Sequence, residues 1–304
     1  MWPKLTYLEW SDTLDTLHLW MQVAGKVKLE LAPFVNHWWE VAFYVSATGL
    51  SSGAIPFGRQ VLQVDFDFLN HVCALQTSAG LRESIPLQPQ SVAEFYRIFM
   101  RKLTSLGVTV SIWPVPVEVY GELIPFAEDV KHAAYDPRYV ERWWHVLIEA
   151  APILEQFRGS FRGKSSPIQF YWGSLDLNGA RYSGKEVQPP QAQGTMRRVL
   201  EFAENEENYA FGFWPGDERF PESAFYSYMY PLPAGADTIK LTDGAYFHEQ
   251  LGEFILPYDM FRTLKHPQAS LLDFLNETYA ATARLAGWNI EALRTSVPVM
   301  RHAD

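Results

Sequence analysis

The feature that most limits how this chain can fold is an order of patterns that occurs twice. In each half an apolar helical stripe precedes a strand-like aromatic run, and two residue pairs can be matched between the halves without a gap. The matched pairs are Leu17-His18 with Trp144-His145 and Phe43-Tyr44 with Phe170-Tyr171. Both matches have one offset of 127 residues, from 18 to 145 and from 44 to 171. Internal similarity at a fixed offset indicates repeated structural units.

The first half begins with apolar residues at the three-and-four spacing of an amphipathic helix, from Ser11 to Leu31. A helix is also predicted from Ser91 to Leu106, because Ser91 and Glu94 have the spacing of a capping box. Between the helices, runs rich in β-branched and aromatic residues predict an antiparallel meander. The predicted strands are Val41–Ala47, Val61–Phe68 and His71–Thr77, with a further strand at Val108–Trp113.

The second half opens with Asp136 and Pro137, which are typical of the N-cap and first position of a helix. A helix is predicted to close it from Ser270 to about Ala286. The predicted strands are Ile168–Ser174, Phe211–Trp214, Ala224–Tyr230 and Glu253–Pro257. The closing serines, Ser91 and Ser270, are 179 residues apart, so the second half holds about fifty additional residues. On the 127-residue offset Gly25 matches Pro152, which predicts a kink in both first helices.

These patterns predict an α+β fold made of two pseudo-repeats, each a helix, an antiparallel β-meander and a helix, packed into one compact unit. We expect one globular unit over residues 1–304. Its predicted parts are a pseudo-repeat at 11–113, a connector at 114–135, a pseudo-repeat at 136–289 with an insertion at about 178–208, and a C-terminal tail at 290–304.

Composition excludes several classes of function. A formal net charge of −10, with no run of Lys or Arg longer than a pair, argues against nucleic acid and anionic membranes as partners. The single cysteine, Cys73, excludes an intramolecular disulfide and a multi-thiolate metal site. No apolar run approaches the roughly 20 residues of a membrane span, and the N-terminus lacks a signal-peptide pattern. We therefore expect a soluble, cytoplasmic protein.

Several strings resemble a bacterial family known as domain of unknown function 5996. They span nearly the whole chain: Asn36–Trp39, Asp65–Phe68, His132–Asp136, Phe161–Asp176, Gly212–Gly216, Phe225–Pro231 and Glu249–Tyr258. The resemblance favours reading the chain as one unit. It implies no activity, cofactor or catalytic residue, because the family is uncharacterised.

Two catalytic motifs are matched only in part. Gly49-Leu50-Ser51-Ser52-Gly53 fits the nucleophile elbow of hydrolases, but a loop-like segment follows it where the motif requires a helix. A Gly/Ser hairpin turn is the better interpretation. Gly159–Ser165 approaches a phosphate loop, yet it has three residues between its glycines instead of four and ends a helix instead of beginning one. Its Lys164, Ser165 and Ser166 could bind an anion or cap the helix end.

Candidate acid, base and metal-ligand residues are spread over the chain. Asp65 and Asp67, about 7 Å apart on one strand face, could pair for acid/base chemistry or metal ligation, although charge on an open sheet face is the simpler interpretation. His37, His71 and His132 could join them as ligands, but no metal site is predicted. His18 and His145 border helix core stripes and are interpreted as structural.

Eleven Trp and fifteen Tyr suit a deep cleft or a thick core. We expect a small-molecule-binding protein, with enzymatic activity left open, whose aromatic and acidic cleft lies between the halves and suits a neutral or cationic ligand such as a sugar. The alternative is a non-catalytic scaffold that uses aromatic surfaces such as Phe225–Tyr230. No cofactor is indicated, and the chain is expected to be a monomer or a homodimer. The candidate pocket residues are His37, Trp38, Asp65, Asp67, His71, His132, Lys164, Ser166, Trp172, Asp176, Arg181 and Trp214.

Overall fold

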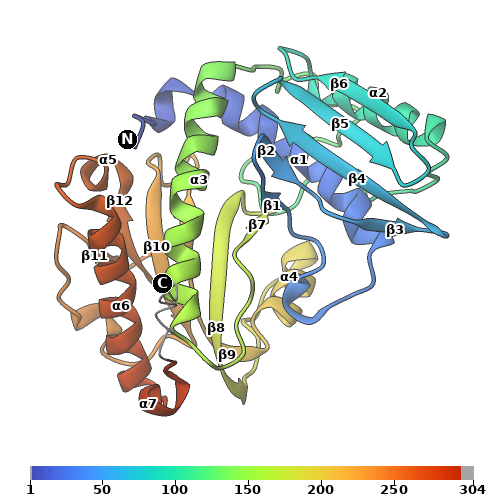
Figure 1. Ribbon diagram of the computed structural model, residues 1–304. Helices are drawn as coiled ribbons and strands as arrows, with labels where there is room; N and C mark the ends of the chain where they lie inside the picture. The colour runs from blue at the N-terminus through green and yellow to red at the C-terminus, as the bar shows by residue number, and fades with distance from the viewer. Residues whose placement is uncertain (1, 296–304) are drawn as a thin grey trace, which may run out of the picture.

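A computed structural model describes residues 2–295 of the chain, and these form two antiparallel sheets with helices packed against each (Figure 1). The predicted α+β class is therefore confirmed. A hydrophobic core runs continuously from one sheet to the other, and Leu17, Phe66, Trp143 and Phe211 all belong to it. Three short 3₁₀ helices, η1 (Tyr7–Glu9), η2 (Asn36–Trp38) and η3 (Ala236–Thr238), lie in the connecting segments.

The first sheet has the strand order β1-β2-β4-β5-β6, and β3 pairs with β4 beside this path. Its strands are β1 (Tyr44–Val45), β2 (Gly49–Ser51), β3 (Ile55–Phe57), β4 (Gln60–Asp67), β5 (Val72–Thr77) and β6 (Arg82–Pro86). Helices α1 (Ser11–Leu31) and α2 (Val92–Ser105) pack on one face, where Trp20 and Phe66 each stack on Phe95. That face is buried because apolar residues alternate with polar ones along β4.

The second sheet has the strand order β11-β12-β10-β9-β8-β7. Its strands are β7 (Gln169–Tyr171), β8 (Asp176–Glu186), β9 (Glu206–Trp214), β10 (Ala224–Tyr230), β11 (Tyr246–His248) and β12 (Glu253–Pro257). Helices α3 (Pro137–Gly159) and α6 (Pro267–Leu285) run across one face of it (Figure 1). Phe157 of α3 and Tyr279 of α6 both pack against Tyr209 there. The opposite face of this sheet is therefore turned away from α3 and α6.

Within residues 2–295, one antiparallel bridge joins the two sheets. Phe43 and Phe170 exchange both backbone hydrogen bonds, each with an N···O distance of 2.8 Å. Both phenylalanines are fully buried. Because these residues lie just before β1 and within β7, the bridge joins the first sheet to the edge of the second.

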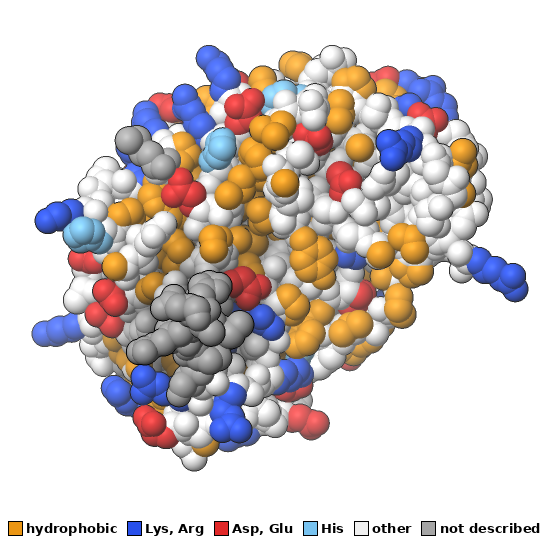
Figure 2. All heavy atoms as spheres, in the orientation of Figure 1, with side chains coloured by type: hydrophobic (Ala, Val, Ile, Leu, Met, Phe, Trp, Pro, Cys, Tyr) orange, Lys and Arg blue, Asp and Glu red, His pale blue; other side chains and the backbone are white. Residues whose placement is uncertain are grey.

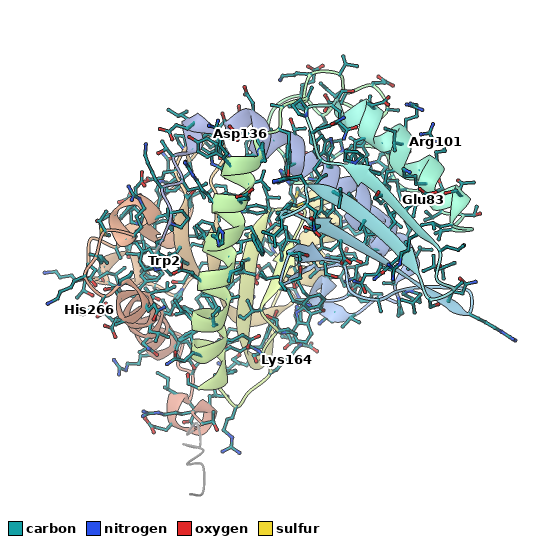
Figure 3. The ribbon with its side chains drawn as sticks, turned by 45° about the horizontal axis from the view of Figure 1, so that its top comes forward. Trp2, Glu83, Arg101, Asp136, Lys164 and His266 are labelled. Carbon is teal, nitrogen blue, oxygen red and sulfur yellow. The ribbon has the colours of Figure 1, made fainter. Side chains whose placement is uncertain are left out.

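Several local predictions hold and others do not. Ser91 Oγ accepts a hydrogen bond from the Glu94 N–H, and Asp136 caps α3, at whose start it lies in Figure 3. Residues 108–113 form no strand, because the chain there runs on into the proline-rich connector. The predicted insertion supplies most of β8, then α4 (Gly194–Ala203) and the start of β9. The last long helix begins at Pro267, three residues before the predicted Ser270.

Gly25 has a different role from the one predicted. Helix α1 continues without a break through Gly25, and α3 continues through Pro152. A Cβ atom at Gly25 would lie 2.2 Å from the Trp172 indole. The glycine is therefore required because Trp172 packs directly on the helix backbone, whereas Pro152 at the matching position in α3 is exposed.

The surface in Figure 2 carries charged side chains of both signs around its rim and scattered hydrophobic ones across its middle. No helix within residues 2–295 is long and apolar enough to cross a membrane. At the C-terminal end, α5 (Tyr258–Phe261) precedes α6, and α7 (Ile290–Leu293) lies in the segment predicted as a tail. Residues 296–304 of that tail are outside the described residues.

Candidate functional site

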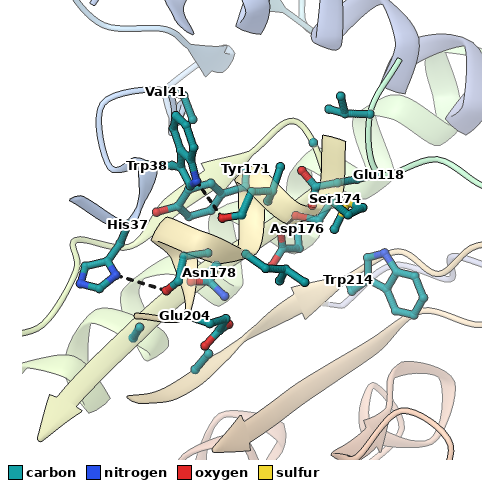
Figure 4. Close-up of a pocket in the computed structure, with 18 of the residues that line it drawn as sticks. His37, Trp38, Val41, Glu118, Tyr171, Ser174, Asp176, Asn178, Glu204 and Trp214 are labelled. Atoms are coloured by element: carbon teal, nitrogen blue, oxygen red, sulfur yellow. Dashed lines mark hydrogen bonds between the residues drawn. The ribbon is translucent and has the colours of Figure 1, made fainter. Parts of the chain in front are cut away.

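A cavity of about 480 Å³ lies on the face of the second sheet that α3 and α6 leave uncovered. Strands β8, β9, β10 and β12 supply its floor. Its walls come from α1, from the η2 segment, from the connector at Val117 and Glu118, and from one side of α4. In Figure 4, His37 and Trp38 lie toward one end, Glu118 and Trp214 toward the other, and Asp176 and Asn178 lie between them.

Because side chains alternate between the two faces of a strand, alternate residues of the sheet form the cavity floor. On β8 and β9 the even-numbered residues face the cavity, while Leu177, Phe211 and Phe213 face the helices. The floor residues are Asp176, Asn178, Ala180 and Tyr182 of β8, Asn208, Ala210 and Trp214 of β9, Tyr226 and Tyr228 of β10, and Glu253 of β12. The sheet therefore has one aromatic face packed on helices and one polar face that lines the cavity.

A network of hydrogen bonds fixes Asp176 at the centre of the floor. The Tyr226 hydroxyl donates to the Asp176 carboxylate and accepts from the Asn178 amide at 2.7 Å. Ser174 donates to the other carboxylate oxygen. The Tyr226 ring reaches Asp176 by crossing β9 at Gly212, where a Cβ atom would lie 2.9 Å from the Tyr226 hydroxyl. Burial raises the pKa of Asp176 above its ordinary value despite these donors.

A second carboxyl group, Glu204, is held in the same manner. The Tyr228 hydroxyl donates to one oxygen at 3.0 Å, and the Asn208 amide donates to the other at 2.6 Å. Burial raises the pKa of Glu204 as well. Asp176 and Glu204 are thus buried acids whose oxygens are already engaged by neutral donors.

Two further acids, Glu118 and Glu253, have no such donors. Neither carboxyl group takes part in a hydrogen bond or an ion pair with the described residues. Desolvation by the cavity walls, followed by the nearby charge of Asp176, raises the pKa of both groups, that of Glu253 to about 8. Glu253 is half-buried, and Glu118 keeps part of its surface exposed to solvent. Both groups are therefore free to bond with a molecule in the cavity, and both can carry a proton near neutral pH.

Glu118 is held in place by its neighbours in the connector. The Gln22 side-chain amide of α1 donates to the Val117 carbonyl oxygen at 2.7 Å and accepts from the Val117 N–H at 2.9 Å. A Cβ atom at Gly173 would lie 2.1 Å from a Glu118 carboxylate oxygen. Glu118 therefore packs against bare backbone, which explains the glycine in the Trp172-Gly173-Ser174 string.

Backbone strain is concentrated around this cavity. Among residues 2–295, six non-glycine residues have a positive φ. His37, Trp38 and Glu118 line the cavity, and Leu175 separates the lining residues Ser174 and Asp176. Such conformations cost about 1–3 kcal/mol each and persist only where the surroundings enforce them, which is typical of binding sites.

His37 and Trp38 join the η2 segment to α4. The Trp38 indole N–H donates to the Val199 carbonyl oxygen at 2.9 Å, and His37 Nδ1 lies 3.1 Å from the Phe202 carbonyl oxygen. This places the Nδ1 proton on the α4 side and leaves Nε2 to accept from Lys164 Nζ at 2.8 Å. Burial, and then the charge of Lys164, lower the pKa of His37. The ring stacks on Tyr182.

Five of the twelve residues predicted for a pocket line this cavity. They are His37, Trp38, Trp172, Asp176 and Trp214. Trp172 donates its indole N–H to the Val41 carbonyl oxygen at 2.9 Å and forms part of the wall beside α1. The remaining seven lie outside the cavity lining.

Asp65 and Asp67 lie on the face of the first sheet that its helices leave open. Asp65 accepts two hydrogen bonds from Gln63, and Asp67 accepts from the backbone N–H groups of Leu69 and Asn70. They therefore stabilise the strand surface and the β4–β5 turn. Neither lines the cavity, because that cavity lies on the other sheet.

The predicted histidines 71 and 132 have local partners away from the cavity. His71 contacts the Tyr135 hydroxyl at 2.9 Å and Glu141 at 3.1 Å. His132 Nδ1 is 2.7 Å from Asp129. Both lie near the first turns of α1 and α3, where Glu141 contacts His71 and Thr16 accepts from the Ala134 N–H, whereas His37 follows the end of α1 and contacts α4.

Lys164, Ser166 and Arg181 lie near the cavity without lining it. Lys164 forms an ion pair with Glu206 and lies beside the end of α3 opposite to Asp136 (Figure 3). Ser166 is buried and its Oγ accepts from the Ala180 N–H at 2.8 Å. Arg181 points to the helix face of β8, where its guanidinium lies 3.4 Å from the centre of the Phe157 ring. These residues attach segment 164–166 and α3 to the sheet.

The partial motifs have structural roles. Gly49–Ser51 is strand β2, paired with β1 and β4, so the segment is neither an elbow nor the hairpin turn that was predicted. Helix α3 ends at Gly159, and Ser165 pairs with Arg181 in an isolated bridge. No group of three His, Cys, Asp or Glu side chains within residues 2–295 is arranged to hold a metal ion.

Sequence reasoning missed several lining residues, above all Lys26, Glu118, Glu204 and Glu253. A signal for the first existed: His18, Gln22 and Lys26 recur every four residues and form a polar line on a helix that is otherwise largely apolar. Glu118 requires a glycine at position 173, where its carboxylate packs on the backbone. The two residues are far apart in the sequence, so that glycine could not indicate Glu118 beforehand.

Comparison with known proteins gives one match. A family model described as "Family of unknown function (DUF5996)" matches residues 2–295. No curated protein and no solved structure matches the chain.

Proposed function

The chain belongs to the DUF5996 family, whose function is unknown, and we propose from the geometry of the cavity that it binds a small polyhydroxylated molecule, such as a sugar, over the polar face of the second sheet. A cavity of about 480 Å³ is within the usual range for a site that encloses one small molecule.

The observation that carries this proposal is a pair of carboxyl groups, Glu118 and Glu253, that have no hydrogen bond or ion pair with the residues that the structure describes. Both lie near enough to Asp176 for its charge to raise their pKa. A hydroxyl group both donates and accepts hydrogen bonds. A carboxyl group that exchanges a proton near neutral pH can meet either need, because it accepts when ionised and donates when protonated. Asn178 and Asn208 add amide groups to the same floor.

Aromatic rings provide apolar surface around these polar groups. The lining includes Trp38, Trp172, Trp214, Tyr171, Tyr182, Tyr226 and Tyr228. Flat rings suit the apolar faces of a sugar ring, and they also attract a cationic group such as the ammonium of an amino sugar. The ligand class is therefore neutral or cationic, and a neutral polyol fits best because Lys26 and Arg219 also border the cavity.

The aromatic segment on which the scaffold alternative was based lies in the second sheet. Phe225–Tyr230 lies entirely within strand β10, between β9 and β12. Phe225 is fully buried, and Tyr226 and Tyr228 face the cavity floor. Tyr228 and Tyr230 are half-buried, so the segment offers little free surface to a partner, and we favour the binding site.

The proposal is tested by mass spectrometry of small molecules that copurify with the full chain, followed by thermal denaturation with D-glucose, D-ribose, D-glucosamine and myo-inositol. A ligand that prefers the folded state raises the melting temperature with a saturable dose dependence. We expect a rise for at least one of these compounds.

Two tryptophan variants provide the matched comparison. Trp214→Leu changes the cavity floor, and Trp113→Leu changes a tryptophan that is 60% exposed just before the connector. The apparent affinity, taken from the dose dependence of the rise in melting temperature, should be at least about threefold weaker for Trp214→Leu. It should stay unchanged for Trp113→Leu. No rise with any of the compounds and no copurifying molecule, or an equal loss in both variants, would contradict the proposal.

Two broader inferences accompany it. We infer a cytoplasmic location from the composition, and we infer that the halves are structural repeats. The second inference is supported by the bridge between Phe43 and Phe170, because residues related by a twofold axis are the ones that pair with each other across it.

A further inference from the structure

Helix α1 carries two buried lysines that differ in their surroundings. Lys26 and Lys28 are 3% and 4% exposed. The Lys28 ammonium donates to the carbonyl oxygens of Ala42 and Ser52, at 2.5 and 2.6 Å. The Lys26 ammonium has no hydrogen bond or ion pair with any described residue, and its side chain lines the cavity. A buried amine without a partner is costly, and it is available to a molecule in the cavity.

Lys26 is also the amine best suited to act as a nucleophile in the cavity. Burial lowers its pKa to about 8, although the charges of Glu118 and then Glu30 oppose the change. At pH 7 about a tenth of such an amine is neutral, against less than about a thousandth of an ordinary lysine. Desolvated lysines of this kind form imines with carbonyl substrates.

Glu118 supplies an acid on the same cavity. Its backbone is fixed through Val117 by Gln22, which lies one helical turn before Lys26 on α1. Glu118 and Lys26 affect each other's ionisation but form no ion pair. Each therefore stays free to bond with a third group in the cavity. Asp176 is the other charged group that acts on Glu118.

We propose that Lys26 forms an imine with the open-chain carbonyl group of a hydroxyaldehyde or hydroxyketone bound in the cavity, and that Glu118 transfers the protons. The inference rests on the proposed function, since such carbonyl compounds are the open-chain forms of sugars.

The chemistry balances without an oxidant. The Lys26 nitrogen lone pair attacks the carbonyl carbon, the C–N bond forms as the C=O π bond breaks, and the oxygen takes a proton from the Glu118 carboxyl group. The nitrogen then loses a proton to the Glu118 carboxylate. The hydroxyl group takes that proton and leaves as water while the C=N bond forms. This leaves a protonated imine and an ionised Glu118, and the imine nitrogen then gives its proton to the Glu118 carboxylate. The products are the neutral imine and one water, and Glu118 has its proton again.

The test uses the full chain with glycolaldehyde as the probe and sodium cyanoborohydride, which reduces an imine to a stable amine. Peptide mass spectrometry then compares labelling of Lys26 with that of the exposed Lys185 at limiting glycolaldehyde and pH 7. We expect Lys26 to be labelled at least about tenfold faster, with a rate that rises with pH to a midpoint near 8. Labelling of Lys26 no faster than Lys185 overturns the proposal.

Variants separate the two parts of the inference. Glu118→Gln should slow Lys26 labelling at least about tenfold while Lys185 labelling and the circular dichroism spectrum stay unchanged. An unchanged Lys26 rate contradicts the role of Glu118. Lys26→Arg and Lys26→Met should both lose the label, and because the rate comparison within the wild-type chain is decisive, misfolding of a variant does not affect the result.

The outcomes also distinguish this inference from the proposed function. If sugars raise the melting temperature but Lys26 is not labelled faster than Lys185, the binding site stands and the imine does not. If Lys26 is labelled rapidly while no sugar or polyol stabilises the protein, the amine is reactive and the ligand class is wrong.

Discussion

The outer face of β4 and the cavity face of β8 each carry two polar side chains two residues apart, but only those on β8 lie in a cavity. Asp65 and Asp67 lie two apart on β4, and Asp176 and Asn178 lie two apart on β8. The first pair borders an open sheet face and is bonded to its own strand and turn. The second is enclosed by α1, α4 and the connector. Covering the second face of a sheet, and not the spacing of its acids, is what converts a polar strand into a site.

The largest expected effect concerns the backbone that lets Tyr226 cross the cavity floor. A Cβ atom in Gly212→Ala would lie 2.1 Å from the Leu177 carbonyl oxygen, so β8 and β9 must separate. We expect a loss of about 3 kcal/mol in the free energy of unfolding, measured by urea denaturation. The control on the first sheet is Gly80→Ala, where φ is +84° and nothing lies within 4 Å, with an expected loss of about 1 kcal/mol. Equal losses would contradict the comparison.

The next effect is the loss of one donor to a buried acid. Tyr226→Phe removes the hydroxyl that bonds Asp176 and Asn178. Since a buried acceptor is left without that partner, we expect a loss of about 1–3 kcal/mol by chemical denaturation. Tyr246→Phe, on edge strand β11, removes a hydroxyl with no hydrogen bond to the described residues and should cost less than about 0.5 kcal/mol.

Replacing Glu253 should raise the free energy of unfolding, unlike the two preceding variants, by an amount that depends on pH. Its pKa is about 8 in the folded chain and 4.5 ordinarily. Between these values the folded state holds a proton that the unfolded state releases, so this group makes the chain less stable as pH rises from 4.5 to 8. Glu253→Gln should therefore gain on the order of 1–2 kcal/mol at pH 8 and little at pH 4.5.

The measurement is the pH dependence of the unfolding free energy for both chains. Glu122→Gln, at an exposed connector residue, serves as the control and should give parallel curves. If the curve of Glu253→Gln also runs parallel to that of the wild-type chain, the carboxyl group of Glu253 is in contact with bulk water.

The smallest effect is expected on the open face. Asp65→Asn keeps an oxygen that can accept from Gln63, so the free energy of unfolding should change by less than about 0.5 kcal/mol. The labelling rate of Lys26 should not change either. A loss comparable to that of Tyr226→Phe would show that the β4 face is covered in solution.

Much of the fold could be predicted because periodicity and capping are local. The limits of α1, β10 and β12, and the caps at Ser91 and Asp136, agree with the sequence patterns. Strand β8 was missed because helices cover one of its faces and the cavity the other, so that Arg181 and Asp176 are both buried and no hydrophobic alternation marks the strand. Helix α4 was missed because none of its residues is fully buried.

The cavity was harder to predict because its lining comes from distant segments. His37, Trp38 and Trp172 could be nominated from aromatic and polar neighbours in the sequence. Glu118 could not, because it lies in a proline-rich stretch with no periodicity, and its position depends on Gln22 and Gly173. Long-range contacts of this kind leave no local pattern.

The two hydrogen bonds between the Gln22 side chain and the Val117 backbone make the site depend on both halves of the chain. Sheet strands of the second half supply the floor, but the acid and the amine of the inferred chemistry arrive from the connector and from the first helix of the other half. A fragment that begins at Asp136 would contain neither Glu118 nor Lys26. In evolution, therefore, neither half can be lost, duplicated or exchanged alone without losing the site, because each supplies part of it.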